Sequence, residues 1–416
     1  MKKFLKYEFV NRAFAFFCFA AVPGLGSVVS FVWHGGALWC VFEILSGRRT
    51  FSRDHNMLVM TLLALLYCVL NAIPTLWHHS TYGGADQMLR LGTLLLFPFS
   101  YSIWSISDKA ALMRTVILAS MVACYSGLAV AMVQTYGFGH RAAGGAGNAI
   151  VFAFAISMAG SISLAGLFSQ ENKLVLPLAG AFVASWLALF YSGTRFLWIT
   201  TLPVDLIVLW IYRRQLSRFI SPRTLALVVL GLALGFGASF KGIQNRLQGL
   251  SSDWYKASLN DNYDTSVGAR LSLLEMAPEY IIQHPFGGHG LGATRKLIET
   301  GFKEKHGLDY SFSHFHNGYL TTAVESGVLG LVSLLAIFVA AIANALRAIR
   351  KNLDPVEVFG GAMLLILTAT YGIGALANKV LGHDIQDTVF IVFLIMGTYL
   401  ASGTSRLTDN DRVAAA

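Results

Sequence analysis

Two histidines and an asparagine stand directly before a long apolar run near the end of the chain. The stretch SFSHFHNGYLTTAVESGVLG spans Ser311 to Gly330 and opens with His314, His316 and Asn317. Because the unperturbed pKa of histidine is about 6.5, such a side chain can take a proton from a hydroxyl group at neutral pH. The pattern therefore allows a general base at the mouth of the apolar run. The alternative is an interfacial histidine that hydrogen-bonds a backbone carbonyl.

The residues that follow predict how this histidine is held. If a helix begins near Ser313, a good N-cap residue, then Gly327 lies about 20° from the face of His316 and Gly330 lies within about 40° of it, whereas Glu325 points to the opposite side. A stripe of small residues lets a second helix approach closely. We therefore expect the imidazole to lie against a neighbouring helix at the water boundary.

Two arginines stand where they could bind phosphate. Arg195 lies in YSGTRFLWI, between two apolar runs, and Arg270 lies in TSVGARLSLLEMA, before an amphipathic stretch. Planar guanidinium groups bind phosphate oxygens bidentately and stay charged, so a pair of them matches a pyrophosphate. For Arg195 the alternative is a side chain that snorkels to lipid headgroups.

A glycine-rich segment, HPFGGHGLG at 284–292, follows Arg270. It lacks GxxxxGK and a preceding strand, so it does not predict a nucleotide-binding loop. We expect it to make a tight turn that returns the chain to the membrane.

A metal site is a further alternative. Several histidines and aspartates could supply ligands: His289, His306, His314, His316, Asp253, Asp261, Asp264 and Asp309. They show no recognised ligand spacing, so we predict no metal and no other cofactor. The four cysteines, Cys18, Cys40, Cys68 and Cys124, lie inside apolar runs, which argues against a disulfide framework or a cysteine metal site.

The composition is that of a membrane protein. The chain has 416 residues, of which 55% are hydrophobic and only 13% charged, whereas a soluble domain carries about 25% charged residues. Apolar stretches of about 20 residues recur along the chain, as in polytopic helical membrane proteins. The net charge of +9 comes from short basic clusters between these stretches. Such clusters orient a membrane protein, so we predict no binding of nucleic acid.

Windows of about 19 residues predict about twelve transmembrane helices, at 10–27, 28–46, 56–76, 88–106, 111–135, 148–168, 174–194, 196–212, 224–240, 317–345, 356–377 and 385–402. The first two are separated by PGLG at 23–26, and both outer flanks, MKKFLK and GRRTFSR, are basic, so placing both flanks on one side of the membrane requires two crossings. With this count the basic clusters fall on one side, so both termini are expected to be cytoplasmic. The prediction is an all-α polytopic protein with helices 1–9 in residues 1–240, one large external loop at 241–316, and helices 10–12 with a tail in 317–416.

Taken together, these residues make the sequence resemble the O-antigen ligase family, membrane enzymes that attach O-antigen to lipid A–core. The hallmark of the family is His, then Asn, Ser or Gln, nine arbitrary residues, Gly, two residues, and Gly, Thr or Tyr. His316, Asn317, Gly327 and Gly330 match this pattern completely. HPFGGHGLG and the arginines of SGTR and GAR resemble further landmarks of the family. The resemblance covers about residues 120 to 400.

The resemblance implies a metal-independent, GT-C-like glycosyltransferase in the bacterial inner (cytoplasmic) membrane, with a periplasmic active site. The donor would be O-antigen on undecaprenyl pyrophosphate, and the acceptor a sugar hydroxyl on lipid A–core. Carried over by position, His316 would be the base that activates the acceptor, and His314 would support the motif. Arg195 and Arg270 would hold the pyrophosphate and neutralise the leaving group. Direct displacement would invert the anomeric centre.

Three other functions remain open at this point. O-antigen polymerases and protein O-oligosaccharyltransferases belong to the same superfamily and differ from the ligases in the acceptor. Only a short tail follows the last predicted span, which favours lipid A–core over a protein acceptor. A transporter or flippase would carry ionisable groups in the middle of its spans, and often an inverted repeat. Asp205 and Glu43 are the mid-span acids found, and no repeat is visible.

Overall fold

The computed structural model describes residues 2–78, 83–169, 174–216, 263–351 and 354–406, with isolated positions at 233, 237 and 255. Every regular element in these ranges is helical, which confirms the predicted all-α class. The elements are α1 (Lys2–Leu25), α2 (Val28–Leu45), α3 (His55–Trp77), α4 (Gly84–Gly92), η1 (Thr93–Leu96), α5 (Phe97–Trp104), α6 (Lys109–Met132), η2 (Val133–Gly137), η3 (Gly144–Ala146), α7 (Ala149–Ser169), α8 (Val175–Ser192), α9 (Arg195–Ile211), α12 (Ser266–Gln283), α13 (Ala293–His306), α14 (Gly318–Lys351), α15 (Pro355–Gly374) and α16 (Asp384–Ser402).

Nine helices of the described ranges are long and apolar enough to cross a membrane: α1, α2, α3, α6 (extended by η2), α7, α8, α14, α15 and α16. The chain is therefore a polytopic membrane protein. Helix α9, predicted at 196–212, has 17 residues. The predicted span at 224–240 and the beginning of the predicted loop, 241–262, lie outside the described residues. The GT-C-like class and the domain boundaries at 240 and 316 stay predictions.

The first two spans form the predicted antiparallel hairpin. The chain turns at Gly26, whose φ is +55°. At the far end of the hairpin, the Tyr7 hydroxyl donates a hydrogen bond to Glu43 over 3.2 Å, and the guanidinium of Arg49 lies over the Tyr7 ring. The two basic flanks, Lys2–Lys6 and Arg48–Arg53, therefore lie at the same end of the molecule, as two crossings require.

The predicted continuous span at 88–106 is wrong. The segment is divided into α4, η1 and α5, with a 3-10 turn at Thr93–Leu96. The Thr93 hydroxyl bonds back to the carbonyl of Arg90, and Pro98 occupies the start of α5. A proline lacks an N–H group and suits the first turn of a helix, so it favours a new helix start over continuation of the old one. A window average does not register this break, because it reports hydropathy and not the pattern of hydrogen bonds.

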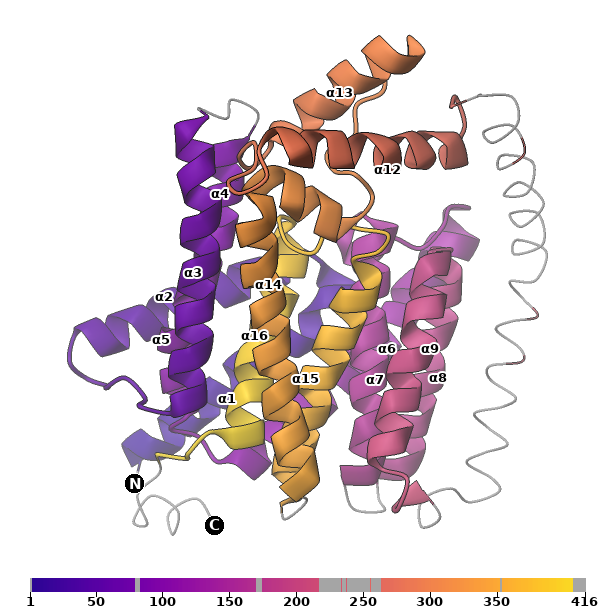
Figure 1. The fold of residues 1–416 in the computed structure, drawn as a ribbon. Helices are drawn as coiled ribbons and strands as arrows, with labels where there is room; N and C mark the ends of the chain where they lie inside the picture. Colours follow the sequence, from indigo (N-terminus) through magenta and orange to yellow (C-terminus); the bar gives the residue numbers. More distant parts are fainter. Residues whose placement is uncertain are drawn as a thin grey trace.

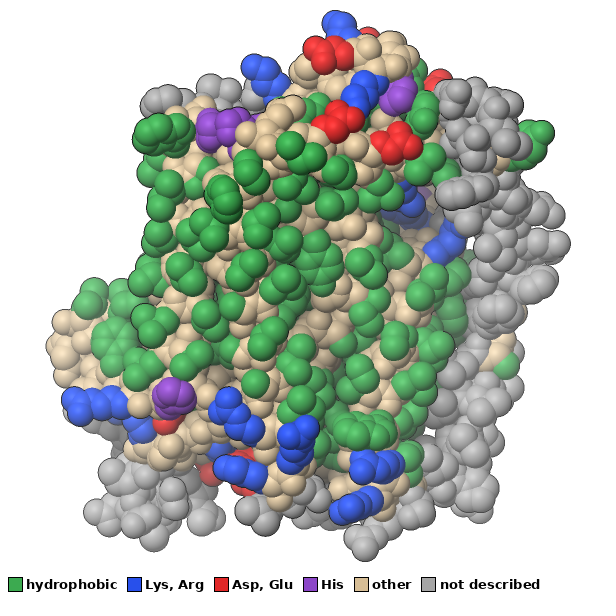
Figure 2. All heavy atoms as spheres, viewed as in Figure 1, with side chains coloured by type: hydrophobic (Ala, Val, Ile, Leu, Met, Phe, Trp, Pro, Cys, Tyr) green, Lys and Arg blue, Asp and Glu red, His purple; other side chains and the backbone are tan. Residues whose placement is uncertain are grey.

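The two ends of the molecule differ in their chemistry. The start of α1 and the end of α16 lie at one end, here called the terminal end, whereas α12 and α13 cover the opposite end, here called the loop end (Figure 1). At the terminal end, Arg406 donates hydrogen bonds to Ser105 and Thr50. Figure 2 shows a broad hydrophobic band between the two ends, with charged side chains gathered above and below it.

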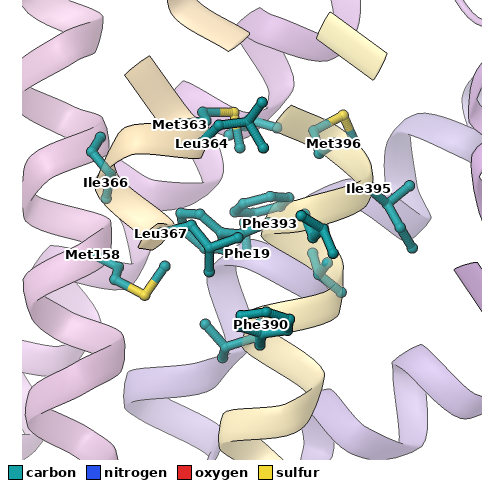
Figure 3. Packing of buried hydrophobic residues seen from close by; sticks show 14 of the residues in the cluster. Phe19, Met158, Met363, Leu364, Ile366, Leu367, Phe390, Phe393, Ile395 and Met396 are labelled. Atoms are coloured by element: carbon teal, nitrogen blue, oxygen red, sulfur yellow. The ribbon is translucent and has the colours of Figure 1, made fainter. Parts of the chain in front are cut away.

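The core is formed where α15 and α16 pack against α1 and α7 (Figure 3). The rings of Phe19 and Phe393 are 4.9 Å apart, and those of Tyr371 and Phe390 are 5.1 Å apart. Of the membrane-crossing stretch of α16, 94% of the residues are buried inside the molecule, whereas in α3 the share is only 33%. Because lipid tails are as apolar as leucine, the helices are held by close packing rather than by a drive to leave the lipid. The described part of the loop end lies above this packed core (Figure 1).

Candidate functional site

The predicted start of the helix after His316 is wrong. Helix α14 begins at Gly318, and its N-cap is Asn317 rather than Ser313. The Asn317 side-chain oxygen accepts hydrogen bonds from the backbone N–H groups of Tyr319 (3.0 Å) and Leu320 (3.1 Å). An asparagine at this position satisfies donors that a helix otherwise leaves free. His316 therefore lies on the short segment before the helix, where its ring is not tied to a helix face.

His316 is held in an unusual backbone conformation. Its φ is +50°, the one positive value at a non-glycine residue in the described ranges. Residues other than glycine seldom adopt this region, and the strain costs about 1–3 kcal/mol unless the surroundings impose it. The half-buried ring packs edge-on against Phe312, with centroids 5.3 Å apart, and lies 4.7 Å from the ring of His314. Strain of this kind clusters at active sites and ligand clamps.

The predicted stripe of small residues is interrupted by a break in α14. Gly327 has φ +68° and ψ −174°, so the residues after it leave the face that His316 was expected to share. Only glycine tolerates this region readily. A break in a membrane helix also exposes backbone groups that need new partners.

The glycine-rich segment supplies those partners. The N–H groups of His289 and Gly290 donate to the carbonyls of Val324 and Glu325, and the N–H of Val328 donates to the carbonyl of Pro285, each over 2.8 Å. The segment does make a turn, since the N–H of Gly288 bonds the carbonyl of His284. However, it continues into α13 at the loop end and not directly into the membrane. Because its glycines carry no side chain, its backbone can pack directly against the backbone of α14 at the break.

Both motif glycines of α14 have a steric explanation. A Cβ atom at Gly327 would lie 2.2 Å from the carbonyl oxygen of Phe286. At Gly330, a Cβ atom would lie 1.9 Å from the Ser326 hydroxyl oxygen, which donates a hydrogen bond to the carbonyl of Thr322. Larger residues at either position would push the glycine-rich segment or Ser326 away. The motif thus encodes a capped helix start and a helix break.

Arg270 lies in the first part of α12, near enough to His316 for its charge to act on that ring. The Thr265 hydroxyl caps α12 by accepting from the N–H of Gly268 over 3.0 Å. Neighbouring residues of α12, Leu273 and Met276 among them, pack in the cluster that also buries Phe315. Arg270 itself is exposed. Burial, and after it the positive charge of Arg270, lower the pKa of His316 to about 4.

A pKa of about 4 means that His316 is a neutral imidazole at neutral pH. Such a ring has one nitrogen free to accept a proton. The pKa of His314 is lowered to about 3, first by burial and then by the charges of His316 and Lys379. The structure therefore brings His316, His314 and Arg270 together at the loop end.

Arg195 lies at the same end, on a different helix. It is the first residue of α9, after a turn in which Gly193 has φ +62°. The Thr194 hydroxyl fixes this turn by donating to the carbonyl of Ala149 over 3.2 Å. The ring of the next residue, Phe196, lies 6.1 Å from that of Phe154.

Packed residues join the turn of Arg195 to the His316 segment. Phe154 packs in turn against Tyr371 of α15, with ring centroids 5.4 Å apart. Four residues later, the carbonyl of Ala375 accepts from the N–H of Gly318 over 2.6 Å. Helices α7 and α15 therefore connect the two predicted positions through continuous packing.

A buried ion pair at the site was missed in the sequence. Glu325 is 2% exposed at its side chain and lies 2.9 Å from the ammonium group of Lys379, which is 17% exposed. An acid inside an apolar run, and a lysine in the short NKVLGHD connection between two spans, were signals that could have pointed to it. A buried charge needs a partner because an unpaired one is strongly destabilising.

The histidines considered as metal ligands do not gather at one place. The ring of His289 lies 4.5 Å from that of His284, whereas the ring of His306 lies 4.0 Å from that of Tyr263. In the ranges that the structure describes, no group of three His, Cys, Asp or Glu side chains could hold a metal ion. Asp253 and Asp261 lie outside those ranges.

Comparison with known proteins supports the resemblance. Residues 180–335 match the family model described as O-antigen ligase. The resemblance to the O-antigen ligase family is thereby confirmed. Arg195, Arg270, His316 and both motif glycines all lie inside the matched stretch. Just over a third of the chain is covered, and it includes α9, α12, α13 and the first half of α14.

Two relatives show similarity over part of their length. An O-antigen ligase of Escherichia coli strain K12 is 25% identical over 201 residues, which is 47% of this chain and 47% of that protein. A Haemophilus influenzae protein described as uncharacterized is 29% identical over 161 residues, which is 38% of this chain and 40% of that protein. The aligned stretch thus spans less than half the length of either relative.

Proposed function

We propose that the chain is a membrane glycosyltransferase that transfers O-antigen from undecaprenyl pyrophosphate to a sugar hydroxyl of lipid A–core. The observation that carries this proposal is the placement of His316: neutral, strained and half-buried beside Arg270, inside the stretch that matches the O-antigen ligase family. A neutral imidazole next to a fixed positive charge suits an acceptor hydroxyl that must lose a proton near a departing anion.

The proposed reaction is a single displacement. A ring nitrogen of His316 takes the proton of the acceptor hydroxyl, and the oxygen forms a bond to the anomeric carbon of the donor sugar. The bond from that carbon to the pyrophosphate oxygen breaks, and its electron pair leaves with undecaprenyl pyrophosphate. Arg270 and Arg195 bind the phosphate oxygens and stabilise the charge that develops on them. The anomeric centre is inverted, and no metal takes part.

The orientation in the membrane follows from the basic residues. At the terminal end they flank the ends of the spans: Arg48, Arg49, Arg53, Lys109, Arg114, Arg213, Arg214, Arg347, Arg350, Lys351 and Arg406. Such residues favour the cytoplasmic side. We therefore place both termini in the cytoplasm and His316 at the periplasmic face of the bacterial inner membrane.

The mid-span acids give little support to a transporter. Asp205 accepts hydrogen bonds from the Ser161 hydroxyl (2.7 Å) and the Trp186 indole (2.9 Å). Glu43 accepts from Tyr7 and forms an ion pair with Arg48 over 3.3 Å. Both acids thus have partners that tie neighbouring helices together, which is a structural role.

An acceptor competition tests the proposal against the related polymerases and protein O-oligosaccharyltransferases. The purified protein in liposomes receives lipid-linked O-antigen together with lipid A–core, a second lipid-linked chain, or an acceptor protein. The proposal predicts that lipid A–core gains the polymer. Elongation of the lipid-linked chain alone, or modification of the protein alone, would show that the acceptor has been assigned wrongly.

A further inference from the structure

We propose that Glu325, Lys379 and Thr294 form a clamp that positions His316 for proton transfer. The inference rests on the proposed function and adds a positioning role for three residues that have none in it. It is based on a set of buried contacts that converge on the segment before α14.

The carboxylate of Glu325 is the centre of the clamp. It accepts hydrogen bonds from the Lys379 ammonium group over 2.9 and 3.1 Å, from the Thr294 hydroxyl over 3.0 Å, and from the N–H of Gly292 over 3.2 Å. Lys379 also donates to Gln87 of α4 over 2.9 Å. One carboxylate thus joins α14 to the start of α13 and to the connection between α15 and α16.

Thr294 connects the clamp to the histidine segment. Its fully buried hydroxyl lies 3.1 Å from the carbonyl oxygen of Ser313, so its hydrogen is within reach of both that oxygen and Glu325. Two residues further on, the N–H of Phe315 donates to the Thr321 hydroxyl over 3.1 Å. The chain is therefore fixed on both sides of His314.

Lys379 stabilises the other boundary of the segment. It belongs to the connection in which the carbonyl of Ala375 accepts from the N–H of Gly318. A Cβ atom at Gly318 would lie 2.6 Å from the carbonyl oxygen of Asn378, so this connection also packs directly on the start of α14. The ammonium group thus ties down the backbone that immediately follows His316 and Asn317.

The strained conformation of His316 explains why a charged clamp is useful. A positive φ at a non-glycine residue persists only when the surroundings impose it. Charge-assisted hydrogen bonds are shorter and stronger than neutral ones and define one geometry. A misplacement of about 1 Å at a reacting group can lower a rate by about 10²-fold. The clamp therefore acts on the turnover number rather than on substrate binding.

Thr294→Val is the variant that separates positioning from stability. It replaces the hydroxyl with a methyl group of the same shape and leaves the ion pair in place. We expect kcat to fall about tenfold or more, within the loss of about 10²-fold that such a misplacement can cause. Donor affinity should stay within about twofold, since Arg195 and Arg270 lie on other helices. Thr294→Ser, which restores the hydroxyl, should recover most of kcat. Thr294→Ala takes the place of the valine variant if the latter does not fold.

Thr368→Val is the matched control. Thr368 is also buried, and its hydroxyl donates to the carbonyl of Leu364 over 2.8 Å, inside α15 and away from the clamp. This variant loses a comparable hydroxyl and should keep the wild-type kcat. An equal loss of kcat in both variants would overturn the proposal, because it would indicate a general effect of threonine removal.

Hydrogen–deuterium exchange gives a readout that does not depend on activity. The clamp predicts faster exchange at the amide of Phe315 in Thr294→Val than in the wild type or in Thr368→Val. Unchanged exchange together with unchanged kcat would overturn the clamp. If the wild-type protein transfers no sugar to any acceptor, the proposed function fails, whereas the exchange result still decides whether the clamp holds the segment.

Discussion

Replacement of Gly327 by alanine is the sharpest perturbation of the helix break. At φ +68° and ψ −174°, the new residue would occupy a region that only glycine adopts readily, at a cost of about 1–3 kcal/mol. Its Cβ atom would also lie 2.2 Å from the Phe286 carbonyl oxygen and 2.7 Å from the Gly287 nitrogen. These are backbone atoms, which cannot swing aside as the end of a side chain can.

The glycine-rich segment must therefore withdraw from α14. Three backbone hydrogen bonds join the two, from His289, Gly290 and Val328. A hydrogen bond contributes about 0.5–1.5 kcal/mol net, so losing them adds to the backbone strain. Together, the backbone strain and the lost hydrogen bonds lower the free energy of unfolding by several kcal/mol. This is a large fraction of the about 5–15 kcal/mol that stabilises a typical protein. The loss should concentrate at the loop end, where the segment holds the start of α13.

Denaturant titration in mixed micelles measures the effect, with hydrogen–deuterium exchange to locate it. Gly35→Ala is the control, because a Cβ atom at Gly35 in α2 meets nothing within 4 Å and alanine favours a helix. We expect Gly327→Ala to be destabilised by several kcal/mol, with faster exchange at 285–292 and in the first turns of α14. Wild-type stability and exchange in Gly327→Ala would refute the explanation given for this glycine.

The remaining predictions concern the site. Arg270→Met and Arg195→Met should each weaken donor binding about 10- to 150-fold, since a hydrogen bond to a charged group contributes about 1.5–3 kcal/mol. Isothermal titration with a lipid-linked donor checks this, and wild-type affinity in both variants would contradict the pyrophosphate role. The pKa of His316 is lowered to about 4, so protonation removes the base only as the pH falls through that value. The pH dependence of kcat/KM reports the pKa values of the free enzyme. Its acid limb should thus lie near pH 4 and not near 6.5. A limb at the ordinary histidine pKa would show that burial and Arg270 do not lower the pKa of this ring. Chelation with EDTA should leave turnover unchanged, and a loss that Mg²⁺ restores would contradict the metal-independent reaction.

The fold class could be predicted because hydropathy reports burial in lipid directly. The hairpin of α1 and α2 was predicted from two basic flanks and PGLG, and the structure confirms it. The span at 88–106 was predicted as continuous because a window average does not register where hydrogen bonding changes. Pro98, at the start of α5, is a local signal of this division.

The site was predicted less completely than the fold. Residue types and spacing selected His316 and Asn317 as candidates, but the helix face drawn through Gly327 assumed that α14 is regular. The break exists because 284–292 packs against 324–328, a contact between segments about 40 residues apart that no local period can show. The pairing of Glu325 with Lys379 is likewise a contact across 54 residues. Such contacts are decided by tertiary packing.

The most direct test of the central claim is the turnover of His316→Gln in liposomes with lipid-linked O-antigen and lipid A–core. Glutamine keeps polar atoms but cannot act as a base, and general base catalysis contributes about 10²–10⁴-fold. The account predicts a loss of kcat in that range, with unchanged donor affinity and an unchanged thermal midpoint. Wild-type turnover in a folded His316→Gln protein would contradict it.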